Sequence, residues 1–422
     1  MEVINTTLDK IKSTRVSLKE TLPYIGPAFL VSVGYMDPGN WATNIEGGSR
    51  FGYQLLAVLF ISNLMAILLQ TMAARLGIVT GKTLAQNCRE QYSRKLNFGL
   101  WVLAELAMIA TDIAEFIGAA IGFYILFGIP LFSSGLITAV VVFIILGFYK
   151  LGYRSVEYII ISLVAVIGFS YLVELILAKP NWTDVAHNVF IPHLDSTNLY
   201  VALGMLGATV MPHNLFLHSG LTLSRTIISP DEPKVKRDKK LIRFAIIDSL
   251  FALNMSWLVN SAMVVMAGAV FFTNGIEVTS LQEAHKTLEP LLGSLSSFVF
   301  AIALLASGLS SSTTSTIAGQ MVLEGFLDIK FNIWIRRLIT VVPALFIIYL
   351  GFNELQILVL SQVVLSLHLP FAIIPLIKFT HDKKLMGENK SPVWVHWLAV
   401  ITAVTISVLN ILLIMKLMGG KF

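Results

Sequence analysis

The segment YMDPGNWATN, residues 35–44, places a carboxylate and two amides inside a long apolar run. Pro38 lacks the N–H that would close a helical hydrogen bond to the carbonyl of Gly34, and it disfavours helical backbone at Asp37. In hydrocarbon such a break is tolerated only where protein or water surrounds it, and an ionisable residue at that depth indicates a functional site. We therefore expect Asp37 and Asn40 to line a polar site inside a membrane protein.

A second break is predicted in the segment GATVMPHNLFLHSG, residues 207–220. Pro212 frees the carbonyl of Ala208 and displaces Met211 from helical backbone. The two breaks together would present a carboxylate, an amide, two carbonyls and a thioether. Oxygen donors with one soft sulfur suit a divalent transition-metal ion, whereas an oxygen-only cage favours Ca²⁺ or Mg²⁺. The alternative is that the prolines only kink their helices and that Met211 fills a gap in the core.

Three acids lie along a third apolar segment, at Glu105, Asp112 and Glu115. Their spacing places them within an arc of about 80° on one helix face, so they cannot all face lipid. Arg336 and Arg337, near the start of a later span, are the obvious partners. Two interpretations remain open, a pathway for protons and a structural cluster of ion pairs.

Other polar residues in the apolar segments have patterns that are less specific for a functional role. His213 titrates near neutral pH in water, which suits a proton relay, but a lone histidine inside a membrane more often serves packing. His218 carries the same two interpretations with less support. Gln70 and Thr111 could add polar contacts near a bound ion.

The composition determines what kind of element must position these residues. The 422 residues are 56% hydrophobic and only 13% charged, with a mean hydropathy of +0.78. Soluble domains carry about 25% charged residues, so we expect one integral membrane domain. Cys88 is the single cysteine, which excludes an intrachain disulfide.

Apolar segments long enough to cross about 30 Å of hydrocarbon predict eleven transmembrane helices. An odd number places the two termini on opposite sides. The breaks fall five spans apart, in spans 1 and 6, which is typical of transporters built from two inverted repeats. We expect a cytoplasmic segment at 1–21 and one transporter domain at 22–422, comprising repeat one at about 22–178, repeat two at about 199–378 and an extra helix at about 393–416. The spans are expected at about 22–48, 53–76, 98–126, 130–149, 156–178, 199–225, 242–272, 291–323, 334–351, 354–378 and 393–416.

The basic residues predict the orientation, because cytoplasmic loops collect lysine and arginine. With the amino terminus inside and the carboxyl terminus outside, all but five of the 30 basic residues fall on the cytoplasmic side. They are spread over separate loops, so the net charge of +5 does not form a patch for nucleic acid. The exceptions are Arg50, Lys179, Lys286, Lys416 and Lys421.

The motifs DPGN in span 1 and MPHN in span 6 resemble those of the natural resistance-associated macrophage protein (Nramp) family of proton-coupled divalent metal transporters. The likeness extends through ATDIAEFIGAAIG at 110–122 and LLASGLSSSTTSTIAGQ at 304–320. It implies an all-α membrane protein of the LeuT type, with two inverted five-helix repeats, unwound helices 1 and 6, and one extra helix. It also implies metal binding by Asp37, Asn40, Met211 and the Ala208 carbonyl, joined in one state by the Gly34 carbonyl.

The resemblance further implies import of Mn²⁺ across the cell membrane, with Fe²⁺, Co²⁺ and Cd²⁺ as other candidate substrates. Protons would move with the metal, through a network of Glu115, Asp112, Glu105, His213, Arg336 and Arg337. We expect no cofactor, no partner beyond lipid, ions and protons, and function as a monomer. One departure concerns Leu309, because family members often have glutamine there and that side chain can approach the ion.

Other functions are less consistent with these residues. A Na⁺-coupled carrier of amino acids or amines could use the same two broken helices, but it would not need a thioether. An intramembrane hydrolase is not expected, because the chain has no H-E-x-x-H zinc motif and no G-x-S-x-G elbow. No P-loop is present, which argues against an ATP-driven pump.

Overall fold

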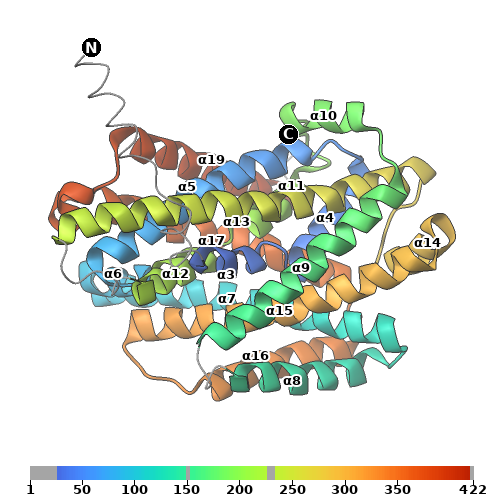
Figure 1. Ribbon diagram of the computed structural model, residues 1–422, viewed down its shortest axis with the longest axis horizontal. Helices are drawn as coiled ribbons and strands as arrows, with labels where there is room; N and C mark the ends of the chain where they lie inside the picture. Colours follow the sequence, from blue (N-terminus) through green and yellow to red (C-terminus); the bar gives the residue numbers. More distant parts are fainter. Residues whose placement is uncertain (1–25, 149–152, 226–232, 419–422) are drawn as a thin grey trace, which may run out of the picture.

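The computed structural model describes residues 26–148, 153–225 and 233–418 as helices and short connections, without β-strands in these ranges (Figure 1). The predicted cytoplasmic segment 1–21 and the first residues of span 1 lie outside the described ranges. Nine helices there are long and apolar enough to cross a membrane, and Leu131–Gly147 is a shorter apolar helix. This confirms an all-α membrane protein, while the count of eleven spans stays a prediction.

Spans 1 and 6 are each described as two helices that meet at the expected breaks. The first is α3 (Pro27–Gly34) followed by α4 (Pro38–Phe51), and the second is α11 (Leu199–Val210) followed by α12 (Pro212–Leu221). The other helices within the described residues are α5 (Leu56–Thr80), α6 (Leu84–Gln91), α7 (Arg94–Phe127), α8 (Leu131–Phe148), α9 (Tyr153–Ala178), α10 (Trp182–Phe190), α13 (Lys234–Val270), α14 (Leu281–Leu292), α15 (Ser294–Leu327), α16 (Ile333–Leu350), α17 (Glu354–His381), α18 (Lys383–Met386) and α19 (Val393–Leu417), with short 3₁₀ turns η3 (Thr222–Arg225), η4 (Phe272–Asn274) and η5 (Gly387–Asn389).

The broken helices lie within the bundle and pack against helices from both halves of the chain, among them α5, α7, α13, α15 and α17 (Figure 1). The apolar window of the span 199–221 is 94% buried, whereas the windows of α16 and α19 are only 33% buried. In Figure 1, α8 and α16 lie together at one edge and α19 lies at the opposite edge. A helix that is apolar all round and buried on every side must contact protein, and one that is largely exposed must contact lipid. The polar residues of the breaks are therefore enclosed by other helices.

Two glycines bring α7 close to its neighbours. A Cβ at Gly118 would overlap the ring of Pro38, and a Cβ at Gly122 would lie 2.8 Å from the Cα of Leu305 on α15. Small residues at this spacing let transmembrane helices approach closely. The helix that carries the three acids is therefore packed directly against the break in span 1.

Candidate metal-transport site

Asp37 sits at the start of α4 with extended backbone (φ −70°, ψ 165°) and caps that helix. Its Oδ1 accepts hydrogen bonds from the backbone N–H of Asn40 at 2.7 Å and from Asn40 Nδ2 at 2.8 Å. The other carboxylate oxygen, Oδ2, is buried and has no hydrogen-bond partner within the described residues. A buried carboxylate oxygen without a donor is costly, so it indicates a place for a cation or a proton.

Three oxygens from both broken helices converge on one atom, Asn40 Nδ2. They are Asp37 Oδ1 at 2.8 Å, the Ala208 carbonyl at 3.1 Å and the Gly34 carbonyl at 3.4 Å. The amide therefore occupies the centre of an oxygen cage, where its N–H groups satisfy acceptors that a positive ion could equally satisfy. Asn40 Oδ1 is buried and, in the part of the chain that the structure describes, has no partner.

Met211 forms the break in span 6 with a positive φ of 41°, which is uncommon for a residue other than glycine. Its sulfur accepts a hydrogen bond of 3.4 Å from Asn214 Nδ2. The same amide nitrogen donates to the Val31 carbonyl at 3.3 Å, and a Cβ at Gly34 would clash with it. Asn214 thus connects the thioether of Met211 with the end of α3, a connection that the sequence did not indicate.

The carbonyls exposed by the first break have partners from two distant helices. Asn260 on α13 donates to the Tyr35 carbonyl at 2.6 Å, and Ser307 on α15 donates to the Met36 carbonyl at 2.6 Å. Asn44 in turn donates to Asn260 Oδ1 at 2.7 Å. These contacts give the Tyr35 and Met36 carbonyls hydrogen-bond donors in place of those that a continuous helix would supply.

Gln362 on α17 is a further polar group beside the break. It is fully buried, and a Cβ at Gly39 would overlap its amide. Its Nε2 donates to Ser361 at 3.1 Å, while its Oε1 has no partner within the described ranges. This role could not be predicted from the sequence, because neither glutamine of span 10, Gln356 or Gln362, has a sequence link to the DPGN motif.

The secondary candidates lie in other surroundings. Gln70 donates to the Tyr35 hydroxyl at 2.7 Å, and its Oε1 is 3.0 Å from His218 Nδ1. Thr111 donates to the Ala107 carbonyl of its own helix at 3.0 Å. Leu309 belongs to an apolar cluster with Ala119, Val142 and Leu146.

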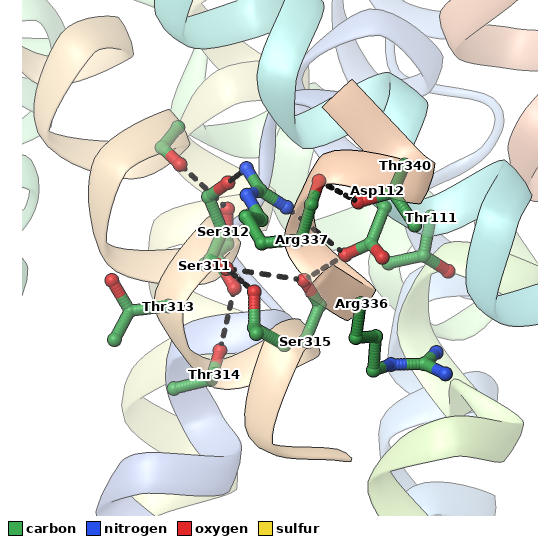
Figure 2. A network of polar contacts seen from close by, with 12 residues as sticks. Thr111, Asp112, Ser311, Ser312, Thr313, Thr314, Ser315, Arg336, Arg337 and Thr340 are labelled. Carbon is green, nitrogen blue, oxygen red and sulfur yellow. Dashed lines mark hydrogen bonds and ion pairs between the residues drawn. The ribbon is translucent and has the colours of Figure 1, made fainter. Parts of the chain in front are cut away.

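Figure 2 shows how one acid of α7 is held by α15 and α16. Ser315 donates to Asp112 Oδ1 at 2.6 Å, and Arg337 Nη1 lies 3.4 Å from the same oxygen. Arg337 Nη2 also donates to the hydroxyl of Ser312. Asp112 and Arg337 are 2% and 1% exposed, so this ion pair is almost dry. The network is therefore a buried contact among three helices.

The other acids of α7 have different environments. Glu105 pairs with Arg336 at 2.7 Å and is 20% exposed. Glu115 is fully buried, and neither of its carboxylate oxygens has a hydrogen-bond partner among the described residues. Glu115 interacts electrostatically with Asp112 on its own helix and with Asp37 at the break in span 1. The interaction with Asp37 could not be predicted from the sequence, whereas Asp112 lies only three residues away on the same helix.

His213 is a buried residue of α12. It is 3% exposed, and its Nδ1 has no partner in the described part of the chain. Its electrostatic neighbour is His368 on α17, which is 6% exposed. His368 could not be selected from the sequence, because it lies on another helix far along the chain.

Comparisons with known proteins place these features in a wider group. Residues 28–416 match the family model described as natural resistance-associated macrophage protein-like. The divalent metal cation transporter MntH of Agrobacterium fabrum is 48% identical over 422 residues, covering 97% of this chain and 90% of that protein. A manganese transporter of Eremococcus coleocola, crystallised with an aromatic bis-isothiourea compound, is 40% identical with a TM-score of 0.84, covering 93% of this chain and 86% of that one.

A more distant likeness concerns the fold alone. Mhp1, a nucleobase-cation-symport-1 family transporter in a closed conformation, is 12% identical with a TM-score of 0.60 and covers 92% of this chain and 89% of that chain. The two chains therefore share an overall fold. The family match over residues 28–416 and the 48% identity to the Agrobacterium fabrum transporter show that the protein belongs to the Nramp family.

Proposed function

We propose that the protein imports divalent transition-metal ions, Mn²⁺ first among them, together with protons. The observation that carries this proposal is the convergence of Asp37, Ala208 and Gly34 oxygens on the Asn40 amide, beside the break at Met211. The names of similar proteins, a divalent metal cation transporter and a manganese transporter, agree with it. Fe²⁺, Co²⁺ and Cd²⁺ are further candidate substrates.

In the proposed binding step, the ion replaces the Asn40 amide nitrogen at the centre of the cage. The Asn40 side chain then rotates so that its oxygen, rather than its N–H groups, faces the ion. Asp37 supplies the negative charge, the carbonyls of Ala208 and Gly34 supply neutral oxygens, and Met211 supplies the thioether. The soft sulfur favours transition metals over Ca²⁺ and Mg²⁺, because those ions prefer oxygen ligands.

Gln362 is a candidate for an additional ligand. Its buried Oε1 lacks a partner within the described residues, and its side chain contacts Gly39, between Asp37 and Asn40 in sequence. An amide oxygen is a suitable donor for a divalent ion. We propose that it joins the ion when α17 and α4 are closely packed, and that Leu309 has no such role from its apolar cluster.

For protons, we propose that Glu115 is the first group beyond the metal site that binds and releases a proton. It interacts electrostatically with Asp37, so a divalent ion arriving at Asp37 would favour loss of a proton from Glu115. Asp112, Glu105, Arg336 and Arg337 continue the polar seam, and His213 on α12 is a further candidate group, with His368 on α17 as its electrostatic neighbour.

The movement proposed is alternating access, in which the two five-helix repeats, at about 22–178 and 199–378, rock around the broken helices. We propose that the protein works as a monomer in the cell membrane, with its amino terminus in the cytoplasm and its carboxyl terminus outside. The basic residues at the ends of the helices support this orientation.

The test is uptake by the purified protein in sealed lipid vesicles, with Mn²⁺ uptake and internal pH recorded together. We expect Mn²⁺ to enter with internal acidification, and Fe²⁺, Co²⁺ and Cd²⁺ to compete, whereas Ca²⁺ and Mg²⁺ at equal concentration do not. Empty vesicles are the control. Uptake of an amino acid or an amine driven by Na⁺, without metal transport, would refute the proposal and favour the alternative carrier.

A further inference from the structure

A long apolar groove on the outside of the bundle lies between α5, α13 and α19. Its volume is about 520 Å³, which falls within the range of about 300–1,000 Å³ typical of ligand pockets. Exposed aliphatic side chains of all three helices line it, among them Leu64, Leu250, Leu398 and Ile401. In a membrane-spanning protein such a surface faces lipid, so its ligand must be soluble in the hydrocarbon core of the bilayer.

The groove has one apolar end and one basic end. Ile61 and Arg75, which both line it, are 14 residues apart on α5, and this corresponds to about 21 Å along the helix. Half of the hydrocarbon core is about 15 Å thick, so the groove is long enough to hold an acyl chain across one leaflet. A single acyl chain anchored at the interface fits this length and polarity.

Arg75 provides the anchoring charge at the basic end. Its Nη1 donates to the carbonyls of Asn389 and Lys390 at 3.2 and 3.3 Å, which hold the guanidinium at the mouth of the groove. Within the part of the chain that the structure describes, no carboxylate neutralises it. An arginine carries five N–H donors, so donors remain for a phosphate after these two contacts.

The surroundings of Arg75 match a lipid headgroup. Trp394, which is 65% exposed, and Pro392 line the same end of the groove, and tryptophan is enriched where membrane meets water. Exposed lysines at 383, 384 and 390 lie on the adjoining connection between α17 and α19. The predicted orientation places this end at the cytoplasmic leaflet, where anionic lipids concentrate.

A second groove of similar size provides an internal comparison. It lies between α3, α9 and α13, has a volume of about 500 Å³, and is lined by residues such as Phe29, Ile160, Leu172 and Met255. Its lining, among the described residues, includes no arginine or lysine. Charge therefore distinguishes two grooves that are alike in size and apolar character.

We propose that the groove between α5, α13 and α19 is a binding site for one anionic phospholipid, whose phosphate contacts Arg75 and whose acyl chain lies along Leu64, Leu250 and Leu398. The lipid connects α13, which contacts both halves of the first broken helix, with α19. It therefore stabilises the folded bundle, and it does not take part in binding the transported ion.

The experiment compares lipid retention and thermal stability of the purified protein with phosphatidylglycerol or phosphatidylcholine that carry identical acyl chains. Native mass spectrometry counts bound lipids, and unfolding is followed at matched lipid concentrations. Glycerol phosphate without acyl chains is the third probe, because it separates a headgroup effect from binding of the whole lipid. One basic residue near the surface contributes about fivefold in affinity for anionic lipid. We expect at least that preference for phosphatidylglycerol.

Two variants, each with a matched control, test whether the lipid binds at Arg75 and in this groove. Arg75→Gln removes the charge, and Arg94→Gln makes the same change at an exposed arginine at the start of α7. Thr71→Phe fills the groove, and Ile144→Phe adds an aromatic side chain on the lipid-facing side of α8. We expect Arg75→Gln to lose the preference for phosphatidylglycerol, Thr71→Phe to lose the retained lipid, and both controls to behave as the unchanged protein.

Several results would overturn the proposal. One is equal retention of the two lipids by the unchanged protein. Another is an equal loss of preference in Arg75→Gln and Arg94→Gln, which would indicate a diffuse basic surface. Stabilisation by glycerol phosphate as strong as that by the lipid would show that the acyl chains do not bind in the groove. If Arg75→Gln fails to fold, unchanged retention in Thr71→Phe still refutes the site.

Discussion

The substitution Asp37→Asn isolates the charge of the proposed metal site from its structural role. Asparagine caps a helix about as well as aspartate, and an amide oxygen can still accept the hydrogen bonds that Asp37 Oδ1 receives from Asn40. We therefore expect the fold to remain and the free energy of unfolding to change by no more than about 1 kcal/mol. The negative charge, by contrast, disappears entirely.

The expected loss of metal affinity follows from the donor set. Asp37 is the single carboxylate among the proposed ligands, the others being neutral oxygens and one sulfur. Removing one member of a buried charge pair costs about 2–5 kcal/mol. At 1.4 kcal/mol for each factor of ten, Mn²⁺ affinity should fall by between about 30-fold and about 4,000-fold.

The assay is calorimetric titration of Mn²⁺ into the purified protein, with thermal unfolding measured on the same samples. Glu174→Gln is the matched control, because Glu174 is a buried acid of α9 that accepts a hydrogen bond from Ser296 and lies outside the proposed site. It should bind Mn²⁺ as the unchanged protein does. If folded Asp37→Asn binds Mn²⁺ within about threefold of normal, Asp37 is not a ligand and the reasoning fails.

Three further predictions concern the neighbouring groups. Met211→Ala should weaken binding of Cd²⁺ more than binding of Mn²⁺, because sulfur adds most to a soft ion; an unchanged ratio of the two affinities in calorimetry would leave the thioether a packing group. Glu115→Gln should retain Mn²⁺ binding, while residual uptake in vesicles loses its internal acidification; normal acidification per metal ion would exclude Glu115 from the proton pathway. Gly118→Val should reduce the uptake rate at least tenfold, since its side chain would overlap Pro38, whereas Gly99→Val, where a Cβ meets no atom within 4 Å, should not; equal rates would show that this close approach is dispensable.

The sequence by itself determined the class of the protein and the positions of its breaks. Low charge and long apolar runs exclude a soluble chain, because hydrocarbon must be the solvent for such a surface. Pro38 and Pro212 act on their own helix, through a missing N–H and a local clash, so their effect depends on adjacent residues alone. The helices accordingly end at Gly34 and Val210, and both resume at the prolines.

The residues of the candidate site could be predicted from the sequence for a similar reason. Asp37 and Asn40 lie within one helical turn, and the Ala208 carbonyl and Met211 lie within one turn of Pro212. Residues this close along the chain keep their spacing in any fold that contains the break. Their convergence from two spans was a prediction drawn from the matching positions of the breaks, and the geometry around Asn40 Nδ2 agrees with it.

Only the tertiary structure decided which distant groups complete and surround the site. Asn260, Ser307 and Gln362 come from three helices with no sequence relation to the breaks, and they contact span 1 because those helices pack there. The pairing of Asp112 with Arg337 and of Glu105 with Arg336 likewise depends on the relative heights of α7 and α16. Such contacts join residues more than 200 positions apart, and their geometry is set by packing between helices, which local sequence spacing does not contain.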